Sequence, residues 1–170
     1  MTPVTIRRLV PADLADYKAL RDHMLKAHPE SFTSDPAPER APESYLSRLG
    51  LQRPEGGEFT LGAWRLGHLV GAVSCERDAR AKVRHIGHII GMMVRSETRG
   101  QGIGRALLEV CIAQARAADG MVMLTLTVTA GNAAAVHLYE RAGFVRYGRL
   151  QRAILVDGVY HAKDQMSLSL

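Results

Sequence analysis

The sequence predicts an α/β fold with a mixed, mostly antiparallel central sheet and helices on both faces. Strand-like runs alternate with amphipathic helices from residue 86 to residue 144, and this alternation favours a sheet covered by helices. Two further pairs of strand-like runs are each joined by two turn-forming residues, Leu66-Gly67 and Asp157-Gly158. Such short connections predict antiparallel hairpins.

The N-terminal part predicts a strand, a helix and an irregular, helix-rich connection before the second strand. Residues 5–9 form the strand, and Pro11 opens a helix that continues to about residue 27. Pro29 ends this helix, a proline-rich loop follows, and residues 43–49 form one short helix. The apolar face of the long helix consists of Leu14, Tyr17, Leu20, Met24 and Leu25.

The remaining elements follow in a regular order. Strands are predicted at residues 59–65, 69–76, 86–94 and 121–128, and the last of these is buried because helices flank it on both sides. After residue 144 a long β segment turns at Asp157-Gly158 and returns over residues 159–170. A helix at residues 104–118 turns inward Ala106, Leu107, Val110, Cys111 and Ala115.

Length and composition indicate one globular domain over residues 1–170, with 46% hydrophobic residues. No apolar run suits a signal peptide or a membrane span, so we expect a cytoplasmic protein without membrane contact. Cys75 and Cys111 lack metal-ligand spacing and disulfide density. They are interpreted as buried free thiols, and no metal site is predicted.

The net charge of +5 and the isoelectric point near 9.6 raise the alternative of nucleic-acid binding. Basic residues concentrate in the segment 77–85, which contains no aromatic side chains for stacking on bases. We therefore interpret this segment as a solvated hairpin loop, with an acidic substrate or partner as the alternative. No nucleic-acid partner is predicted.

A glycine-rich segment separates the predicted strand 86–94 from the helix that follows it. Glycine lets a backbone approach an anion closely, and a helix start offers that anion unpaired N–H groups. Arginines at both ends of the segment add positive charge. The segment therefore predicts a phosphate-binding turn. It consists of Arg99, Gly100, Gln101, Gly102, Ile103, Gly104 and Arg105.

Two common nucleotide-binding patterns do not fit this turn. The P-loop requires a Lys-Ser or Lys-Thr pair after the glycines, and none follows. A dinucleotide fingerprint requires a glycine at the position of Leu107 and an acidic residue on the next strand, which has none. The remaining pattern, R-x-x-G-x-G, comprises Arg99, Gly102 and Gly104.

A second motif, N-x-x-A-x-x-L-Y-x-x-x-G-F, occupies residues 132–144. Asn132 is predicted to cap a helix, Tyr139 lies two turns further on, and Gly143 ends the helix. In this order, the two motifs resemble the signatures of the GNAT N-acetyltransferase superfamily. The resemblance implies a GNAT-like fold, acetyl-CoA as cosubstrate, no metal, and an amine as acceptor.

The resemblance also implies a role for individual residues. The main chain of Met92, Met93 and Val94 pairs with the pantetheine arm, and a backbone N–H of this strand polarises the thioester carbonyl. The side chains of Met92 and Met93 are interpreted as packing. Residues 99–105 hold the pyrophosphate, and Asn132 and Ala135 contact the cofactor. Tyr139 donates a proton to the departing thiolate, for which a phenol is chemically suited.

The general base is less clearly marked. Many superfamily members carry a glutamate at the position of His88. Histidine can serve as a base at neutral pH, although a histidine on an apolar strand also fits a structural role. Glu76, His85 and a water chain remain alternatives.

The sequence therefore predicts an enzyme that moves an acetyl group from acetyl-CoA to a primary amine of a small molecule, peptide or protein by direct transfer. The alternative is a GNAT-like module that binds an acyl-CoA as a sensor without turnover. The acceptor is not encoded in a motif, because its pocket is expected from the variable segments 29–56, 77–85 and 150–161. The oligomeric state stays open, a homodimer included.

Overall fold

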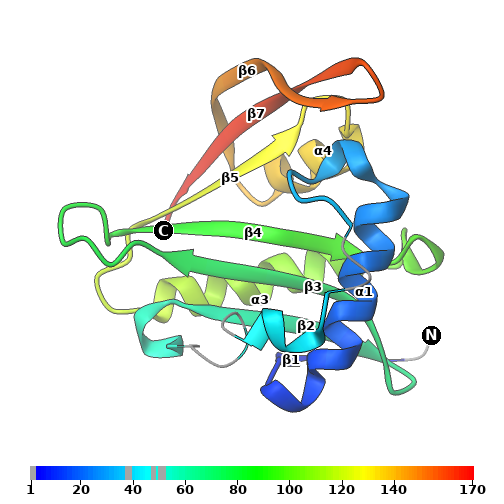
Figure 1. Cartoon of the computed structure of the whole chain (residues 1–170). Coiled ribbons are helices and arrows are strands. Elements are labelled where there is room, and N and C mark those ends of the chain that lie inside the picture. The colour runs from blue at the N-terminus through cyan, green and yellow to red at the C-terminus, as the bar shows by residue number, and fades with distance from the viewer. Residues whose placement is uncertain (1–2, 37–39, 47–48, 50–52) are drawn as a thin grey trace.

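The computed structural model describes residues 3–36, 40–46, 49 and 53–170. They build a seven-stranded sheet in the order β1-β2-β3-β4-β5-β7-β6 (Figure 1). β4 and β5 are parallel, and the other neighbouring pairs described are antiparallel. The predicted fold class is confirmed. The strands are β1 (Thr5–Arg8), β2 (Phe59–Arg65), β3 (His68–Arg77), β4 (Ile86–Val94), β5 (Met123–Thr129), β6 (Val145–Val156) and β7 (Val159–Ser169).

Helices cover both faces of the sheet (Figure 1). Helix α1 (Leu14–Ala27) packs on one face, and α3 (Ile103–Ala117) with α4 (Ala133–Arg141) packs on the other. Neighbouring residues of β3 divide between these layers, since successive side chains of a strand point to opposite faces. Ala72 packs in the core beneath α1, whereas Val73 packs in the core beneath α3.

Short 3₁₀ helices replace parts of the predicted helices. The first predicted helix begins with η1 (Pro11–Asp13), and α1 starts only at Leu14, with its predicted apolar face buried. The helix predicted at residues 43–49 begins as η3 (Pro42–Tyr45), where the Leu46 N–H bonds to Glu43. Residues 47 and 48 lie outside the described part of the chain. The other 3₁₀ helices are η2 (Pro29–Ser31), η4 (Pro54–Gly56) and η5 (Ser96–Thr98).

The inward face of α3 is wider than predicted. Leu107, Cys111 and Ala115 are fully buried as expected. Leu108 and Ile112 are also buried, whereas the predicted Ala106 and Val110 are half-buried. Leu107 and Leu108 are adjacent and both buried, as are Cys111 and Ile112. The buried stripe of α3 is therefore centred between the two members of each pair. Cys75 and Cys111 are free and buried, which confirms their predicted state.

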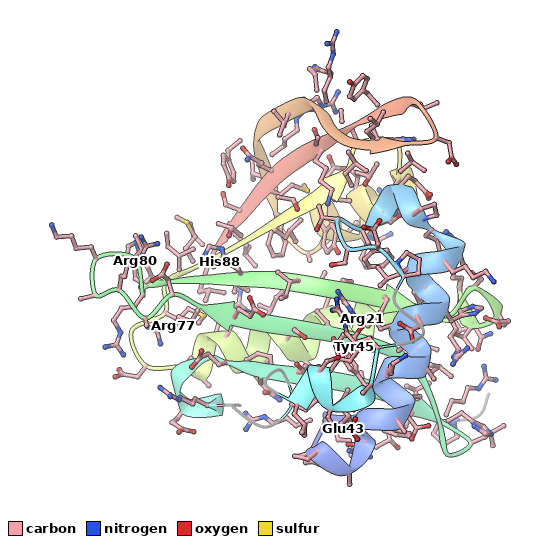
Figure 2. The ribbon with its side chains drawn as sticks, in the orientation of Figure 1. Arg21, Glu43, Tyr45, Arg77, Arg80 and His88 are labelled. Carbon is pink, nitrogen blue, oxygen red and sulfur yellow. The ribbon has the colours of Figure 1, made fainter. Side chains whose placement is uncertain are left out.

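The basic segment 77–85 connects the antiparallel strands β3 and β4, as predicted. Arg77 donates from Nη1 to the carbonyl of Gly56 at 2.8 Å, and Arg80 pairs with Asp78. Figure 2 shows both arginines at the loop, at the end of the sheet opposite α1. Part of the positive charge of this loop therefore serves local structure.

Candidate active site

The parallel strands β4 and β5 separate soon after they begin. Their pairing ends at His88 and Thr125, and beyond that point the two strands diverge as a fork (Figure 1). No strand among the described residues pairs with the edge of β4 that faces the fork, from Ile89 to Val94. Free backbone N–H and C=O groups on such an edge can pair with an extended ligand. The fork thus suits the pantetheine arm that the resemblance implies.

A β-bulge turns β4 inside the fork. Gly91 has a φ of 59°, and the register with β3 shifts between Ala72 and Ser74. A bulge reverses the alternation of side chains along a strand. Consequently Ile89 packs in the core with α3, whereas Met93 is buried beneath α1. The packing role predicted for the Met93 side chain agrees with this position.

A cleft of about 840 Å³ lies in the fork, within the size range of small-molecule sites. It collects most of the predicted cofactor-binding residues, although these come from β4, the glycine-rich turn and α4. The lining includes Met92, Met93, Val94, Arg99, Gly100, Gly102, Ile103, Gly104, Arg105, Asn132, Ala135 and Tyr139. Gln101 is not part of the lining, and its side chain accepts a hydrogen bond from Arg65.

The backbone conformation of the turn requires two of its glycines but not the third. Gly100 and Gly102 have φ values of 74° and 77°, a conformation that glycine adopts without strain. Gly104 has no positive φ, and a Cβ there would meet Leu138 and Met92 at an ordinary 3.6 Å. Neither backbone angle nor packing within the protein requires Gly104 to be glycine. Gly104 lines the cleft, so a side chain at this position would take up room inside it.

The turn leads directly into the first turn of α3. Gly102 is the N-cap, and the first helical bond runs from the Ala106 N–H to the Gly102 carbonyl at 2.9 Å. The N–H groups of Ile103, Gly104 and Arg105 therefore have no acceptor within the helix. All three residues line the cleft, so the positive end of the helix dipole lies beside it, which favours an anion there.

The two arginines of the turn already have contacts. Arg99 donates from Nη2 to His28 Nε2 at 2.9 Å, and Arg105 donates from Nε to Glu109 at 2.7 Å. Because a guanidinium only donates, the bonded nitrogen of His28 is unprotonated. This bond ties the chain after α1 to the phosphate-binding turn.

Tyr139 lies at the inner wall of the cleft. Its side chain is only 5% exposed and packs edge-on against Phe144 with a centroid distance of 5.9 Å. Burial raises the pKa of the Tyr139 hydroxyl, so the phenol stays protonated at neutral pH. At the start of the same helix, Asn132 accepts a hydrogen bond from the Ala135 N–H at 3.2 Å, which confirms the predicted cap.

His88 is not part of the cleft lining, which begins at its neighbour Ile89. Its imidazole is exposed, and Nδ1 lies 2.7 Å from Thr125 Oγ1. Figure 2 places it near the closed end of the fork, beside the loop that carries Arg80. Glu76 and His85 are also absent from the lining. A base role for any of the three requires a bridging water.

For the other side of the cleft, the sequence predicted an acceptor pocket from the segments 29–56, 77–85 and 150–161 but marked no single residue. Glu30 of η2 and His161 of β7 fall within two of these segments and line the cleft, as does Lys163 of β7, whereas no residue of 77–85 is part of the lining. The Thr129 hydroxyl donates to the Glu30 carbonyl at 2.7 Å and so fixes η2 against β5. No motif connects these residues, because η2 and β7 lie far apart in the chain.

The described residues contain no cluster of three or more His, Cys, Asp or Glu side chains suited to a metal ion. No helix in this part of the chain combines the length and apolar character needed to cross a bilayer.

Comparison with known proteins gives two relatives with informative names. The chain is 37% identical to N-alpha-acetyltransferase 30 of Saccharomyces cerevisiae over 90 residues, 52% of this chain and 50% of the relative. It is 31% identical to mycothiol acetyltransferase of Salinispora arenicola over 147 residues, 85% of this chain and 45% of the relative. The chain thus spans about half the length of these curated relatives.

The fold and the family agree with these relatives. The structure of a GNAT-family acetyltransferase from Streptococcus pneumoniae superposes with a TM-score of 0.86 at 28% identity, covering 99% of this chain and 100% of that chain. The model of the acetyltransferase (GNAT) family matches residues 17–144. The predicted resemblance is confirmed, and the chain belongs to the acetyltransferase (GNAT) family.

Proposed function

We propose that this protein is an enzyme that transfers the acetyl group of acetyl-CoA directly to a primary amine. The observation that carries the proposal is one cleft that joins the phosphate-binding turn, the free edge of β4 and Tyr139. Membership in the family supports acetyl-CoA as cosubstrate. The names of the two relatives support an amino group as acceptor.

In this proposal, the backbone holds the cosubstrate. The free N–H groups at the start of α3, with Arg99 and Arg105, bind the pyrophosphate. The unpaired edge of β4 binds the pantetheine arm, and one of its N–H groups polarises the thioester carbonyl. Both contacts use atoms that are fixed before the ligand arrives, which lowers the entropy cost of binding.

Tyr139 supplies the proton that the leaving group needs. When the amine nitrogen attacks the thioester carbonyl, the carbon–sulfur bond breaks and coenzyme A leaves as a thiolate. Tyr139 lines the cleft, and burial raises the pKa of its hydroxyl, so the proton is present at neutral pH. The neighbouring Phe144 fixes the plane of the ring.

His88 takes the proton of the acceptor amine through a water molecule. The bond between Nδ1 and Thr125 orients the imidazole, which leaves Nε2 for the water. Glu76 lies directly opposite His88 in the register of β3 and β4. A water chain from either group reaches the cleft at Ile89 and Ile90.

Direct transfer fits the state of the two cysteines. Burial raises the pKa of Cys75 to about 12 and also raises the pKa of Cys111, so both remain thiols at neutral pH. A thiol is a poor nucleophile compared with a thiolate, and neither residue lines the cleft. The acetyl group therefore passes to the acceptor without a cysteine-bound intermediate.

The test measures coenzyme A release from acetyl-CoA with a panel of amino acids, amino-acid amides, polyamines and peptides. Mass spectrometry of the products should show an acetylated amine for at least one class. Thermal stabilisation by acetyl-CoA, measured in parallel, separates the two functions considered. Stabilisation without release for any amine would favour the sensor module over the enzyme.

A further inference from the structure

Lys163 is an unpaired cation inside the cleft. Its side chain is half-buried and lines the cleft. Among the described residues it has no hydrogen-bond or ion-pair partner. Burial lowers the pKa of its ammonium group, which reflects the cost of holding a charge away from water. An anionic ligand group at this position would offset that cost.

The register of the sheet shows from which side Lys163 can be reached. Lys163 lies directly opposite Thr129 in the antiparallel pair of β5 and β7, so the two side chains share a face. Thr129 contacts Glu30 of η2. The alternate residues Leu124, Leu126 and Val128 of β5 face the core with α3. Lys163 therefore faces the side covered by η2, not the side from which α3 presents its N-terminus.

Two more ionisable groups lie around Lys163. His161 lies two residues earlier on the same face of β7 and also lines the cleft. Its ring has no hydrogen-bond partner among the residues that the structure describes. Glu30 is the sole carboxylate in the described lining, and no ion pair joins it to Lys163. This region thus offers a carboxylate on η2 and two potential cations on β7, with Thr129 between them.

We infer that Lys163 binds a carboxylate of the acceptor, and that the preferred acceptors are amines that carry such a group, as free α-amino acids do. This inference rests on the proposed acetyltransferase function and names its substrate class. Lys163 donates to the carboxylate, His161 lies beside it as a second donor, and Glu30 attracts the ammonium group. The acceptor thus binds with its amine between η2 and the fork.

The experiment compares free α-amino acids with the matching α-amino-acid amides in the coenzyme A release assay. An amide keeps the amine and the side chain but lacks the carboxylate. Its amine is also the more easily deprotonated, so a preference for the acid cannot come from amine reactivity. We expect kcat/KM to be roughly tenfold to a hundredfold higher for the acids, which is typical of one charged hydrogen bond in a cleft.

The variants Lys163→Gln and Lys163→Arg assign this preference to the residue. Lys163→Gln should raise KM for the acids, remove the difference between acids and amides, and leave the affinity for acetyl-CoA unchanged. Lys163→Arg should keep most of the preference. Because the Lys163 side chain has no hydrogen-bond or ion-pair partner among the described residues, Lys163→Gln should fold with an unchanged or higher Tm. The exposed Lys26 of α1 lies outside the cleft lining and is the matched control, and Lys26→Gln should change none of these values.

Several results would overturn the inference while the proposed function stands. One is an equal kcat/KM of the wild-type protein for acids and amides, and another is an equal loss of kcat/KM for both in Lys163→Gln. Weakened acetyl-CoA binding in that variant, or an acetyl group found on Lys163 itself, would also overturn it. Acetyl-CoA binding without transfer to any amine of the panel would instead overturn the proposed function, and the inference with it.

Discussion

The cleft has two sides that carry their chemistry on different atoms. The proposed cofactor side, made by β4, residues 99–105 and the starts of α3 and α4, is lined by the backbone of the glycine-rich turn and by Tyr139. The proposed acceptor side, made by η2 and β7, is lined by Glu30, His161 and Lys163. Both sides are joined at the fork between β4 and β5.

This difference explains why one side is visible in the sequence and the other is not. Backbone binding restricts the chain itself, since Gly100 and Gly102 need positive φ and Gly104 leaves room for a ligand. Such restrictions fall on consecutive residues and form a motif. Side-chain binding needs only one suitable group per strand or turn. It can therefore change with the acceptor while the cofactor side stays the same.

The largest effect should come from Gly102→Val on the cofactor side. At roughly 100 times Kd, acetyl-CoA stabilises a protein by about 2.7 kcal/mol, which raises the Tm of a domain of this size by roughly 5 to 10 °C. We expect Gly102→Val to lose this shift, because the variant strains the turn and places a branched side chain beside the ligand. Thermal denaturation with and without acetyl-CoA measures it.

Gly67 provides the matched control for Gly102→Val. It has the same φ of 77° and open space around it, but it lies in the turn between β2 and β3. Gly67→Val should lower the Tm by a similar amount through backbone strain and keep the full acetyl-CoA shift. If acetyl-CoA raised the Tm of both variants equally, the phosphates would bind elsewhere on the protein.

Tyr139→Phe should lower kcat by about 10²-fold, the usual range for loss of a general acid, and keep acetyl-CoA affinity within a few-fold. The phenyl ring retains the packing against Phe144, so the fold should persist. Steady-state kinetics with a saturating acceptor measures kcat. Tyr147 is 60% exposed on β6, and Tyr147→Phe serves as control. An unchanged kcat in Tyr139→Phe would show that the thiolate leaves unprotonated.

His88→Ala should lower kcat/KM by about tenfold, less than the 10² to 10⁴ of a base in direct contact, because a water intervenes. A base works in its unprotonated form, so kcat/KM should rise with pH in the wild-type protein, and His88→Ala should remove this rise. The Tm should change little, since the imidazole is exposed. A rise that persists in the variant would move the base to one of the alternatives, Glu76, His85 or a water chain.

Asp164→Asn should change stability without changing the kinetics. Asp164 is buried and accepts hydrogen bonds from Arg149 at 2.6 and 3.0 Å, on the face of β7 opposite to Lys163. We expect a loss of about 1 to 2 kcal/mol at neutral pH, as for one charged hydrogen-bonded pair near the surface. Chemical denaturation measures the loss, and kcat/KM should stay within twofold.

The effect of Asp164→Asn should depend on pH. The bond to Arg149 holds the pKa of the Asp164 carboxyl below its usual range. A lowered folded-state pKa stabilises the protein above the pKa of the unfolded chain, and this stabilisation disappears as pH falls through the folded-state value. The difference in unfolding free energy between wild type and variant should therefore shrink in acid. A constant difference would show that packing, not charge, accounts for the loss.

Local patterns predicted most of the fold. The hairpin turns, the fork strands and the helix after the glycine-rich turn all lie within a few residues of their predicted places. The errors arose where local rules compete. Pro11 and Pro42 each begin a 3₁₀ helix at or next to the predicted start of an α-helix. The buried face of α3 is wider than predicted, because residues on both sides of the predicted stripe contact the sheet.

The sequence by itself determined the cofactor side, because backbone angles, helix starts and the Asn132 cap are properties of consecutive residues. It also marked Tyr139, through its fixed spacing from Asn132. Only the tertiary structure decided which side chains line the proposed acceptor side. The bulge at Gly91 and the end of pairing at His88 open the fork, and Thr129 of β5 holds η2 beside the strand that pairs with β7. Those contacts join segments far apart in the chain. The hydrophobic core holds these segments together, but it does not determine which polar residues line the cleft.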